Sequence, residues 1–296
     1  MIEDTLYDRS PLPERKPLRW PNGARLAVVV ILCLEAVEWE PHGGVAPPAA
    51  RGAVYPRAFD STVLSLHEYG NRVGIFRVLD VLDRLGIPGT AAVDALLAET
   101  RPTIVEECVA RRFAFAGRGE SASRMVTELM AEDEERAEIE RCLSAVADVT
   151  GERPTGWFAT GYGESTRTLG LLADAGVRYV CDWPNDEQPY PIGPPPRRLV
   201  SLPAAVDLDD EVVLRLRSIP VDRWAKMVTD AGARLLADGR ESGRLLVLPL
   251  HPYVVGQPFR IRYLERTLAT LARADGVWLA TADDVVGSLT RDTATS

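Results

Sequence analysis

Several features that would point to particular functions are missing from the sequence. The four cysteines are too widely and irregularly spaced to form the CxxC pairs of zinc or redox sites. No GxGxxG follows the first predicted strand and no GxxxxGK[ST] occurs, which removes support for dinucleotide-binding and P-loop enzymes. A net charge of −9 gives the chain no reason to bind nucleic acid or an anionic membrane. We therefore expect a small-molecule substrate and no cofactor.

Long hydrophobic segments are also missing. The longest apolar run, residues 26–34, has nine residues and is too short to span a bilayer. Residues 1–20 are polar and rich in proline, without the apolar centre of a secretory signal. Unpaired thiols are typical of a reducing compartment. The sequence thus predicts a cytoplasmic protein with no membrane span.

What the sequence does contain is an alternation of short apolar runs with amphipathic stretches, which is typical of βα units around a parallel sheet. At 296 residues, a closed barrel is favoured over an open sheet. We predict an α/β protein, a distorted (β/α) barrel of about seven parallel strands in one domain over residues 26–290, after an N-terminal extended arm over residues 1–25. The predicted strands are 26–34, 90–93, 113–116, 156–158, 179–182, 199–202, 214–219, 245–250 and 277–281, and the longer predicted helices are 73–85, 127–149 and 221–238.

Polar residues directly follow several of these strands. Because parallel barrels build their active sites at the C-terminal ends of the strands, we expect these side chains to converge. Glu35 follows the first strand, Arg118 the third, Asp182 the fifth and His251 the LVLPL strand. Further candidates close to strand ends are Trp39, Trp157, Glu164, Trp183 and Asn185.

Each of these residues also has a structural interpretation. Glu35 as a loop charge and His251 as a hydrogen-bonded core histidine are both disfavoured by their positions right after buried strands. Arg118 lies in a Gly-Arg-Gly segment, where a turn residue and a ligand-binding residue are equally compatible with the sequence. Asp182 is compatible with a helix-capping role as well as a catalytic one.

Six segments carry a resemblance to a known family. They are residues 7–11 (YDRSP), 20–23 (WPNG), 69–74 (YGNRVG), 153–157 (RPTGW), 182–189 (DWPNDEQP) and 250–260 (LHPYVVGQPFR). With these segments the chain resembles the polysaccharide-deacetylase-like (NodB-type) superfamily, in its branch of allantoinase-like and metal-independent cyclic-imide hydrolases. The resemblance implies a distorted barrel, hydrolysis of an amide C–N bond in a small cyclic ureide or imide, and a homo-oligomer, either dimer or tetramer.

The departures from the family pattern concern the metal. Metal-using deacetylases have an aspartate pair after the first strand, where this chain has Glu35, and two histidines four residues apart, which this chain lacks. The allantoinase-like relatives end their third strand with Gly-His-Gly, where this chain has Arg118. Because an arginine cannot lose its proton to bind a cation, we predict that no metal is bound.

The reaction we predict is metal-independent hydrolysis of a small cyclic amide, imide or ureide. Glu35 is the candidate general base, with Asp182 as a second candidate, and His251 would protonate the leaving nitrogen. Arg118 and Arg72 would stabilise the oxyanion or bind a substrate carboxylate, which favours an anionic substrate.

The remaining candidates are expected to bind the substrate: Trp39, Trp157 and Trp183 as walls for a planar ring, with Glu164 and Asn185 as polar contacts. His42 and His67 follow no predicted strand, so we expect them to lie outside the site. Two alternatives stay open: a biosynthetic cyclase or lyase on the same fold, and a non-catalytic ligand-binding homologue.

Overall fold

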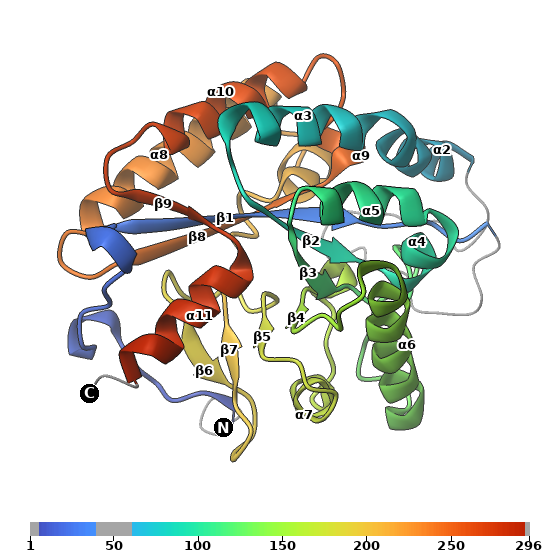
Figure 1. Ribbon diagram of the computed structural model, residues 1–296, viewed down its shortest axis with the longest axis horizontal. Coiled ribbons are helices and arrows are strands. Elements are labelled where there is room, and N and C mark those ends of the chain that lie inside the picture. The colour runs from blue at the N-terminus through green and yellow to red at the C-terminus, as the bar shows by residue number, and fades with distance from the viewer. Residues whose placement is uncertain (1–5, 40–60, 294–296) are drawn as a thin grey trace.

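A strand of nine apolar residues lies at the centre of the fold. β1 (Leu26–Leu34) is buried along its whole length, as expected for a valine-rich run covered on both faces. It pairs in parallel with β2 (Gly89–Val93), β8 (Arg244–Leu250) and β9 (Val277–Ala280). Figure 1 shows β1 crossing the middle of the computed structural model, which describes residues 6–39 and 61–293.

The sheet curls into a barrel. From β2 it continues in parallel through β3 (Ala114–Gly117), β4 (Gly156–Trp157), β5 (Tyr179–Val180) and β7 (Leu199–Ser201), and β6 (Tyr190–Ile192) adds an antiparallel edge. The chain just after β7 returns to β8, where Ala204 forms an isolated parallel bridge with Val247. The predicted α/β barrel is therefore confirmed, with a nine-stranded sheet in which β6 is the one antiparallel member among the described strands.

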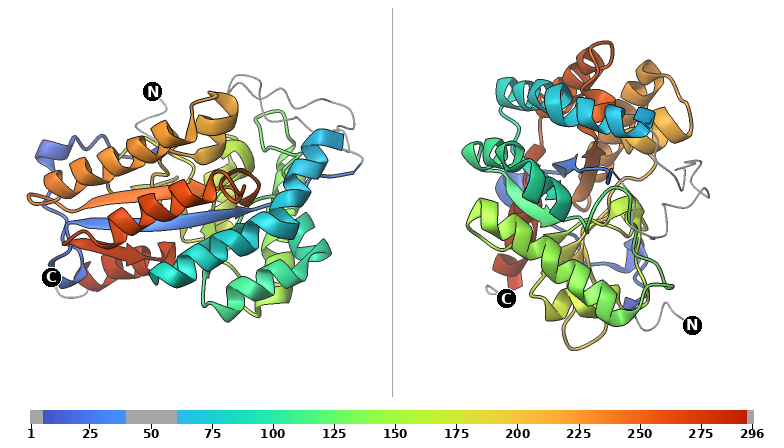
Figure 2. Two further views of the ribbon diagram at one scale, coloured as in Figure 1. Left: turned by 90° about the horizontal axis from the view of Figure 1, so that it is seen from above. Right: turned by 90° about the vertical axis from the view of Figure 1, so that its right-hand side faces the viewer.

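Helices cover the outside of the sheet (Figures 1 and 2). In chain order they are α2 (Ser61–Tyr69), η4 (Gly70–Gly74), α3 (Ile75–Leu85), α4 (Ala95–Thr100), α5 (Pro102–Ala110), α6 (Glu132–Thr150), α7 (Thr168–Asp174), η6 (Glu211–Leu216), α8 (Val221–Asp238), α9 (Pro252–Val255), α10 (Ile261–Ala272) and α11 (Ala282–Thr293). None of the described helices combines the length and the apolar character that a membrane crossing needs.

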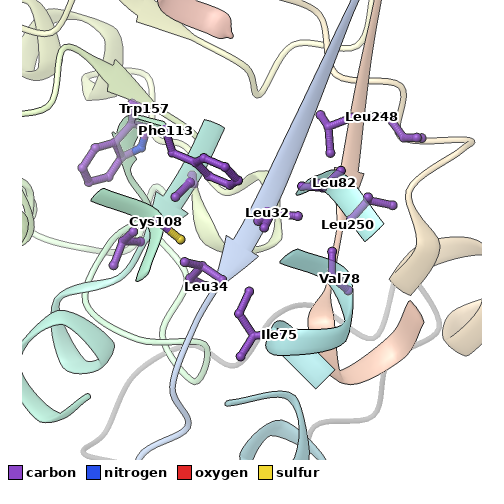
Figure 3. Packing of buried hydrophobic residues seen from close by; sticks show 14 of the residues in the cluster. Leu32, Leu34, Ile75, Val78, Leu82, Cys108, Phe113, Trp157, Leu248 and Leu250 are labelled. Atoms are coloured by element: carbon purple, nitrogen blue, oxygen red, sulfur yellow. The ribbon is translucent and has the colours of Figure 1, made fainter. Parts of the chain in front are cut away.

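Side chains of β1 alternate between two hydrophobic cores. Leu32 and Leu34 belong to the core between sheet and helices, together with Ile75 and Val78 of α3 (Figure 3). The odd-numbered residues, Cys33 among them, belong to the second core, which fills the barrel interior. This alternation determines where the candidate site lies, because residue 35, the next odd-numbered position after Cys33, points into the mouth of the barrel.

The N-terminal arm lies on its own barrel along the part that the structure describes. The Trp20 side chain is buried and donates a hydrogen bond from Nε1 to the carbonyl oxygen of Arg244 at 2.8 Å. Arg15 forms an ion pair with Asp186 at 2.5 Å. The arm is thus held by its own barrel, and the homo-oligomer that the resemblance implies stays a prediction.

Most predicted elements are present, and one prediction is wrong. Residues 214–219 were predicted as a strand, but the chain there belongs mostly to the helix η6 and the turn after it. The carboxylate of Asp209 accepts hydrogen bonds from the backbone N–H groups of Glu211 and Val212, at 2.9 and 3.2 Å, and so caps the start of this helix. The long helix predicted from residue 127 begins at Glu132 instead.

Candidate active site

Glu35 lies at the mouth of the barrel, as predicted. It continues the interior-facing row of β1, and its side chain is only 6% exposed. Its backbone carbonyl oxygen accepts a hydrogen bond from Asn71 Nδ2 at 3.1 Å. The first strand and the helix η4 thus fix the Glu35 backbone from two directions.

Arg118 is brought against Glu35 by β3, which pairs with β2 beside β1. Its Nε lies 2.9 Å from Glu35 Oε2, its Nη1 donates to the carbonyl oxygen of Phe158 at 3.3 Å, and its Nη2 lies 3.3 Å from His251 Nε2. The guanidinium is 3% exposed and stacks over the Phe158 ring at 5.0 Å. Because all three of its nitrogens contact protein groups, the expected free fork for a substrate carboxylate is not present in this arrangement.

His251 is held in one orientation by the residues around it. It follows β8, and Pro252 restricts its backbone to the extended conformation seen here, with φ −104° and ψ 114°. One oxygen of Asp210 contacts both the backbone nitrogen, at 2.9 Å, and the ring Nδ1, at 2.8 Å. With Nδ1 bound to Asp210, the ring presents Nε2 to the mouth, as a proton donor or acceptor requires.

The charge on His251 is set by its carboxylate neighbours. Burial alone lowers the pKa of His251, but nearby groups, Cys33, Asp209 and Glu211 first among them, raise it well above 6.5. Burial also raises the pKa of the Cys33 thiol above 9.0, so near neutral pH that thiol carries no charge and the carboxylates favour the imidazolium. The 3.3 Å contact with Arg118 suits a neutral ring, but we give more weight to the carboxylates because Asp209, Asp210 and Glu211 all contact the ring nitrogens.

Sequence reasoning missed Asp209 and Asp210 beside His251, and it also missed His67 and Glu211. His67 was expected to lie elsewhere, but α2 places its Nδ1 3.5 Å from Glu35 Oε1, and its ring stacks on Tyr253 at 4.1 Å. Glu211 begins η6, and its Oε2 lies 3.8 Å from His251 Nε2. Neither residue follows a strand, so the rule that located Glu35 and His251 could not find them. His42 lies outside the described residues.

Asp182 follows β5 as predicted, but it belongs to a separate pair of carboxyl groups. Its Oδ1 accepts a hydrogen bond from the backbone nitrogen of Ala159 at 2.8 Å. Burial, together with the charge of Asp182, raises the pKa of Glu164 well above 4.5, and Trp183 Nε1 donates to Glu164 Oε2 at 2.9 Å. Burial and the nearby Asp182 carboxylate thus favour the protonated form of Glu164.

Several predicted substrate-binding residues do not reach the mouth. Trp157 faces the helices and is buried in the outer core, where its ring packs close to Gly117 (Figure 3). Trp39 is 66% exposed, and Arg72 is exposed on η4. Asn185 is exposed and accepts a hydrogen bond from Tyr190 at 2.6 Å, next to the N-terminal arm. A strand-end position does not by itself determine which face of the sheet a side chain occupies.

One group of described residues has the ligand types of a metal site. The ligand atoms of Asp209, Asp210 and His251 lie within 4.8 Å of one another. The two carboxylates, however, already accept hydrogen bonds from the protein: Asp210 from His251, and Asp209 from backbone N–H groups and from the Tyr162 hydroxyl at 2.8 Å. This geometry suits carboxylates that orient an imidazole better than carboxylates that hold a cation.

Comparisons with known proteins show a partial match to a family model. Residues 59–180 match the model of the polysaccharide deacetylase family. The match covers less than half of the chain, and it ends before Asp182, Glu211 and His251.

Individual proteins are similar to this chain over most of its length. A Schizosaccharomyces pombe protein named provisionally as a polysaccharide deacetylase is 24% identical over 90% of each chain. The structure of PuuE allantoinase is similar with a TM-score of 0.81, at 24% identity over 94% of this chain and 95% of that one. A probable polysaccharide deacetylase from Pseudomonas aeruginosa PAO1 has a TM-score of 0.82, at 24% identity over 94% and 96% of the two chains. At these identities the structural likeness establishes the fold.

The described residues of the mouth do not present the metal ligands of the metal-using deacetylases. The position after β1 is occupied by Glu35, whose carboxylate contacts the guanidinium of Arg118 at 2.9 Å instead of facing open space. A permanent cation in this place repels a second one. The described residues around Glu35 therefore do not fit a catalytic metal.

Proposed function

We propose that this protein hydrolyses a C–N bond in a small cyclic amide, imide or ureide without a metal. The observation that carries the proposal is the contact chain at the barrel mouth, in which Arg118 touches both Glu35 and His251. A carboxylate, a guanidinium and an imidazole supported by a carboxylate are the groups that amide hydrolysis needs when no metal activates the water.

Each group has a distinct role in the proposed reaction. Glu35 takes a proton from water while the water oxygen attacks the carbonyl carbon. The N–H groups of Arg118 and His251 converge and stabilise the negative charge that develops on the carbonyl oxygen. When the C–N bond breaks, His251 Nε2 donates its proton to the leaving nitrogen, and the ring opens to a carboxylic acid and an amine or amide.

Asp182 suits the role of base less well than Glu35. Its Oδ1 accepts a backbone hydrogen bond from Ala159, and its charge acts on Glu164 and not on the groups of the mouth. Support for a cyclic substrate comes from the sequence resemblance and from the likeness to an allantoinase. The expectation of an anionic substrate assumed that the Arg118 guanidinium could bind a substrate carboxylate. Because the nitrogens of Arg118 contact protein groups instead, that expectation is no longer supported.

The experiment is a hydrolysis screen with purified protein in buffer treated with chelator. The panel contains hydantoins, cyclic imides, ureides and N-acetylated sugars, and ring opening is followed by chromatography. We expect turnover of a cyclic compound that is lost in Glu35→Gln and His251→Asn but kept in Glu241→Gln, which removes one exposed charge far from the mouth. Turnover of N-acetylated sugars alone, or turnover that Glu35→Gln retains in full, would refute the proposal.

A further inference from the structure

Three residues on one side of the segment formed by α2 and η4 face the barrel mouth. His67, Gly70 and Asn71 have the spacing of residues that share one side of a helix. Asn71 Nδ2 donates a hydrogen bond to the carbonyl oxygen of Glu35 at 3.1 Å. A Cβ atom at Gly70 would lie 2.7 Å from the backbone nitrogen of Tyr253, so the close approach of the two helices needs glycine. The position of His67 is therefore fixed against both β1 and α9.

The imidazole ring of His67 is also fixed in orientation. It stacks on the Tyr253 ring with 4.1 Å between the centroids and 26° between the ring planes. Its side chain is 3% exposed, and its Nδ1 lies 3.5 Å from Glu35 Oε1. The other oxygen of this carboxylate, Oε2, accepts a hydrogen bond from Arg118 Nε at 2.9 Å. Arg118 thus holds one oxygen of the candidate base, and the other oxygen faces the imidazole.

The His67 imidazole is mostly neutral at pH 7. Burial is the largest influence, and it lowers the pKa of His67 below 6.5. The charges of Glu35 and Glu211 act in the opposite direction, and those of His251 and Arg215 add to the lowering. A neutral imidazole has one N–H, and an ionised carboxylate only accepts hydrogen bonds, so the tautomer with the proton on Nδ1 suits Glu35. His67 therefore directs an uncharged N–H group at the carboxylate.

The distance between this N–H group and the carboxylate suits a bridging water. A direct N–H···O bond has an N···O distance of about 2.7–3.2 Å, and the 3.5 Å here is longer. His67 Nδ1 has no hydrogen-bond partner among the described residues, and a buried donor without a partner is costly. A water that accepts from Nδ1 and donates to Glu35 Oε1 would satisfy both groups.

We propose that His67 is a further catalytic residue, which together with Glu35 Oε1 holds the water that attacks the substrate carbonyl. The Nδ1–H group of His67 donates to the water oxygen, and one O–H of the water donates to Oε1. In the reaction this proton passes to Oε1, and a lone pair of the water oxygen forms the bond to the carbonyl carbon. The electron pair of the C=O π bond moves to the carbonyl oxygen, and His67 keeps its proton. The inference rests on the proposed function for the reaction that the water undergoes.

The first experiment locates the water and needs no substrate. Crystal structures of the wild type and of His67→Phe are compared at a resolution that shows ordered water. Phenylalanine keeps a ring for stacking on Tyr253 and removes Nδ1. The wild type should have a water within about 3.2 Å, a normal hydrogen-bond distance, of both His67 Nδ1 and Glu35 Oε1, and the variant should lack it. A wild type without this water, or with a direct hydrogen bond from Nδ1 to Oε1, would overturn the inference.

The second experiment measures the effect of the water site on turnover. With a cyclic compound that the wild type hydrolyses, His67→Phe should lower kcat and kcat/KM equally, by about 10²-fold, as expected when a reacting group is misplaced. In His67→Asn the side-chain amide nitrogen takes the place of Nδ1, so this variant should keep at least about a tenth of wild-type turnover. The control is Glu68→Gln, which alters the neighbouring residue on α2 and removes its ion pair with Arg101. It should keep wild-type turnover.

The outcomes separate this inference from the proposed function. Urea unfolding checks that the variants are folded. Turnover above about a tenth of wild type in folded His67→Phe, or equal losses in the Phe and Asn variants, would overturn the catalytic role of His67. If the wild type hydrolyses a cyclic compound but lacks the water, the proposed function stands and the role of His67 falls. If the water is present but the wild type hydrolyses no cyclic compound, the proposed function fails and the water site at His67 stands.

Discussion

Two buried acidic groups, Glu35 and Glu164, lie beyond the C-terminal ends of strands, and the protein accommodates their charges differently. Glu35 contacts the guanidinium of Arg118, so a fixed cation balances its charge. Glu164 lies near Asp182, and there burial and the Asp182 charge raise the pKa of Glu164 well above 4.5, which favours its protonated form. A carboxylate beside a cation stays available to accept a proton from water, whereas a protonated carboxyl serves as a hydrogen-bonding group. From this comparison we assign a catalytic role to Glu35 with Arg118 and a structural role to Glu164 with Asp182.

The strongest test of this comparison removes the imidazole next to Arg118. His251→Asn keeps a donor for Asp210 but removes the imidazolium from between buried carboxylates, so the variant should fold with a lowered melting temperature. Loss of the general acid should lower turnover by about 10²–10⁴-fold. Steady-state kinetics and thermal unfolding check the two expectations. If the variant keeps more than about a tenth of wild-type turnover, a smaller loss than a general acid normally causes, His251 is not the proton donor.

The second test breaks the ion pair at Glu35. Arg118→Met leaves a buried carboxylate without its cation, and breaking a buried pair in this way costs about 3–5 kcal/mol of unfolding free energy. The double variant Arg118→Met/Glu35→Gln should recover most of that loss, because no uncompensated charge remains. Urea unfolding of both variants and of Glu35→Gln gives the unfolding free energies that complete the double-mutant cycle. Equal destabilisation of the single Arg118 variant and the double variant would show that the arginine acts through packing alone.

The third test concerns the Glu164 pair and its pH dependence. The pKa of folded Glu164 is raised above 4.5, so the folded state binds more protons than the unfolded state. This contribution to stability is present below about pH 4.5 and is lost as pH rises towards the folded pKa. Glu164→Gln supplies a permanent donor to Asp182, so its stability relative to wild type should increase between pH 5 and pH 8. Parallel stability curves for the two proteins over that range would exclude a raised pKa of Glu164.

The sequence predicted the barrel and half of the mouth because both depend on local patterns. Apolar runs located the strands, and the residues after them located Glu35, Arg118 and His251. The other half depends on tertiary placement: His67 and Glu211 come from helices, and helix α2 was not predicted at all. Three adjacent acids, Asp209 to Glu211, were a signal, but the strand wrongly predicted over residues 214–219 placed them before a strand instead of at the start of the helix η6.

Strand-end position also could not decide orientation or partners. Trp157 and Phe158 are neighbours at the end of β4, yet Phe158 lies in the barrel interior and Trp157 in the outer core. A shift of one residue in the predicted strand would place Trp157 in the barrel interior and Phe158 in the outer core. Only the structure shows that the Arg118 guanidinium contacts other groups of the protein. Its three contacts are with residues that are distant in the sequence.

The smallest expected effect is that of metal removal, which tests whether the cation at Glu35 is Arg118 alone. Dialysis against chelator should leave turnover unchanged, and elemental analysis should find well under one equivalent of zinc. The reason is geometric: Arg118 occupies the cation position beside Glu35, and Asp209 and Asp210 accept hydrogen bonds from the protein. Stoichiometric metal that restores lost activity would contradict this arrangement. In that case Asp209→Asn identifies the site, because a cation held by Asp209, Asp210 and His251 would be lost from that variant.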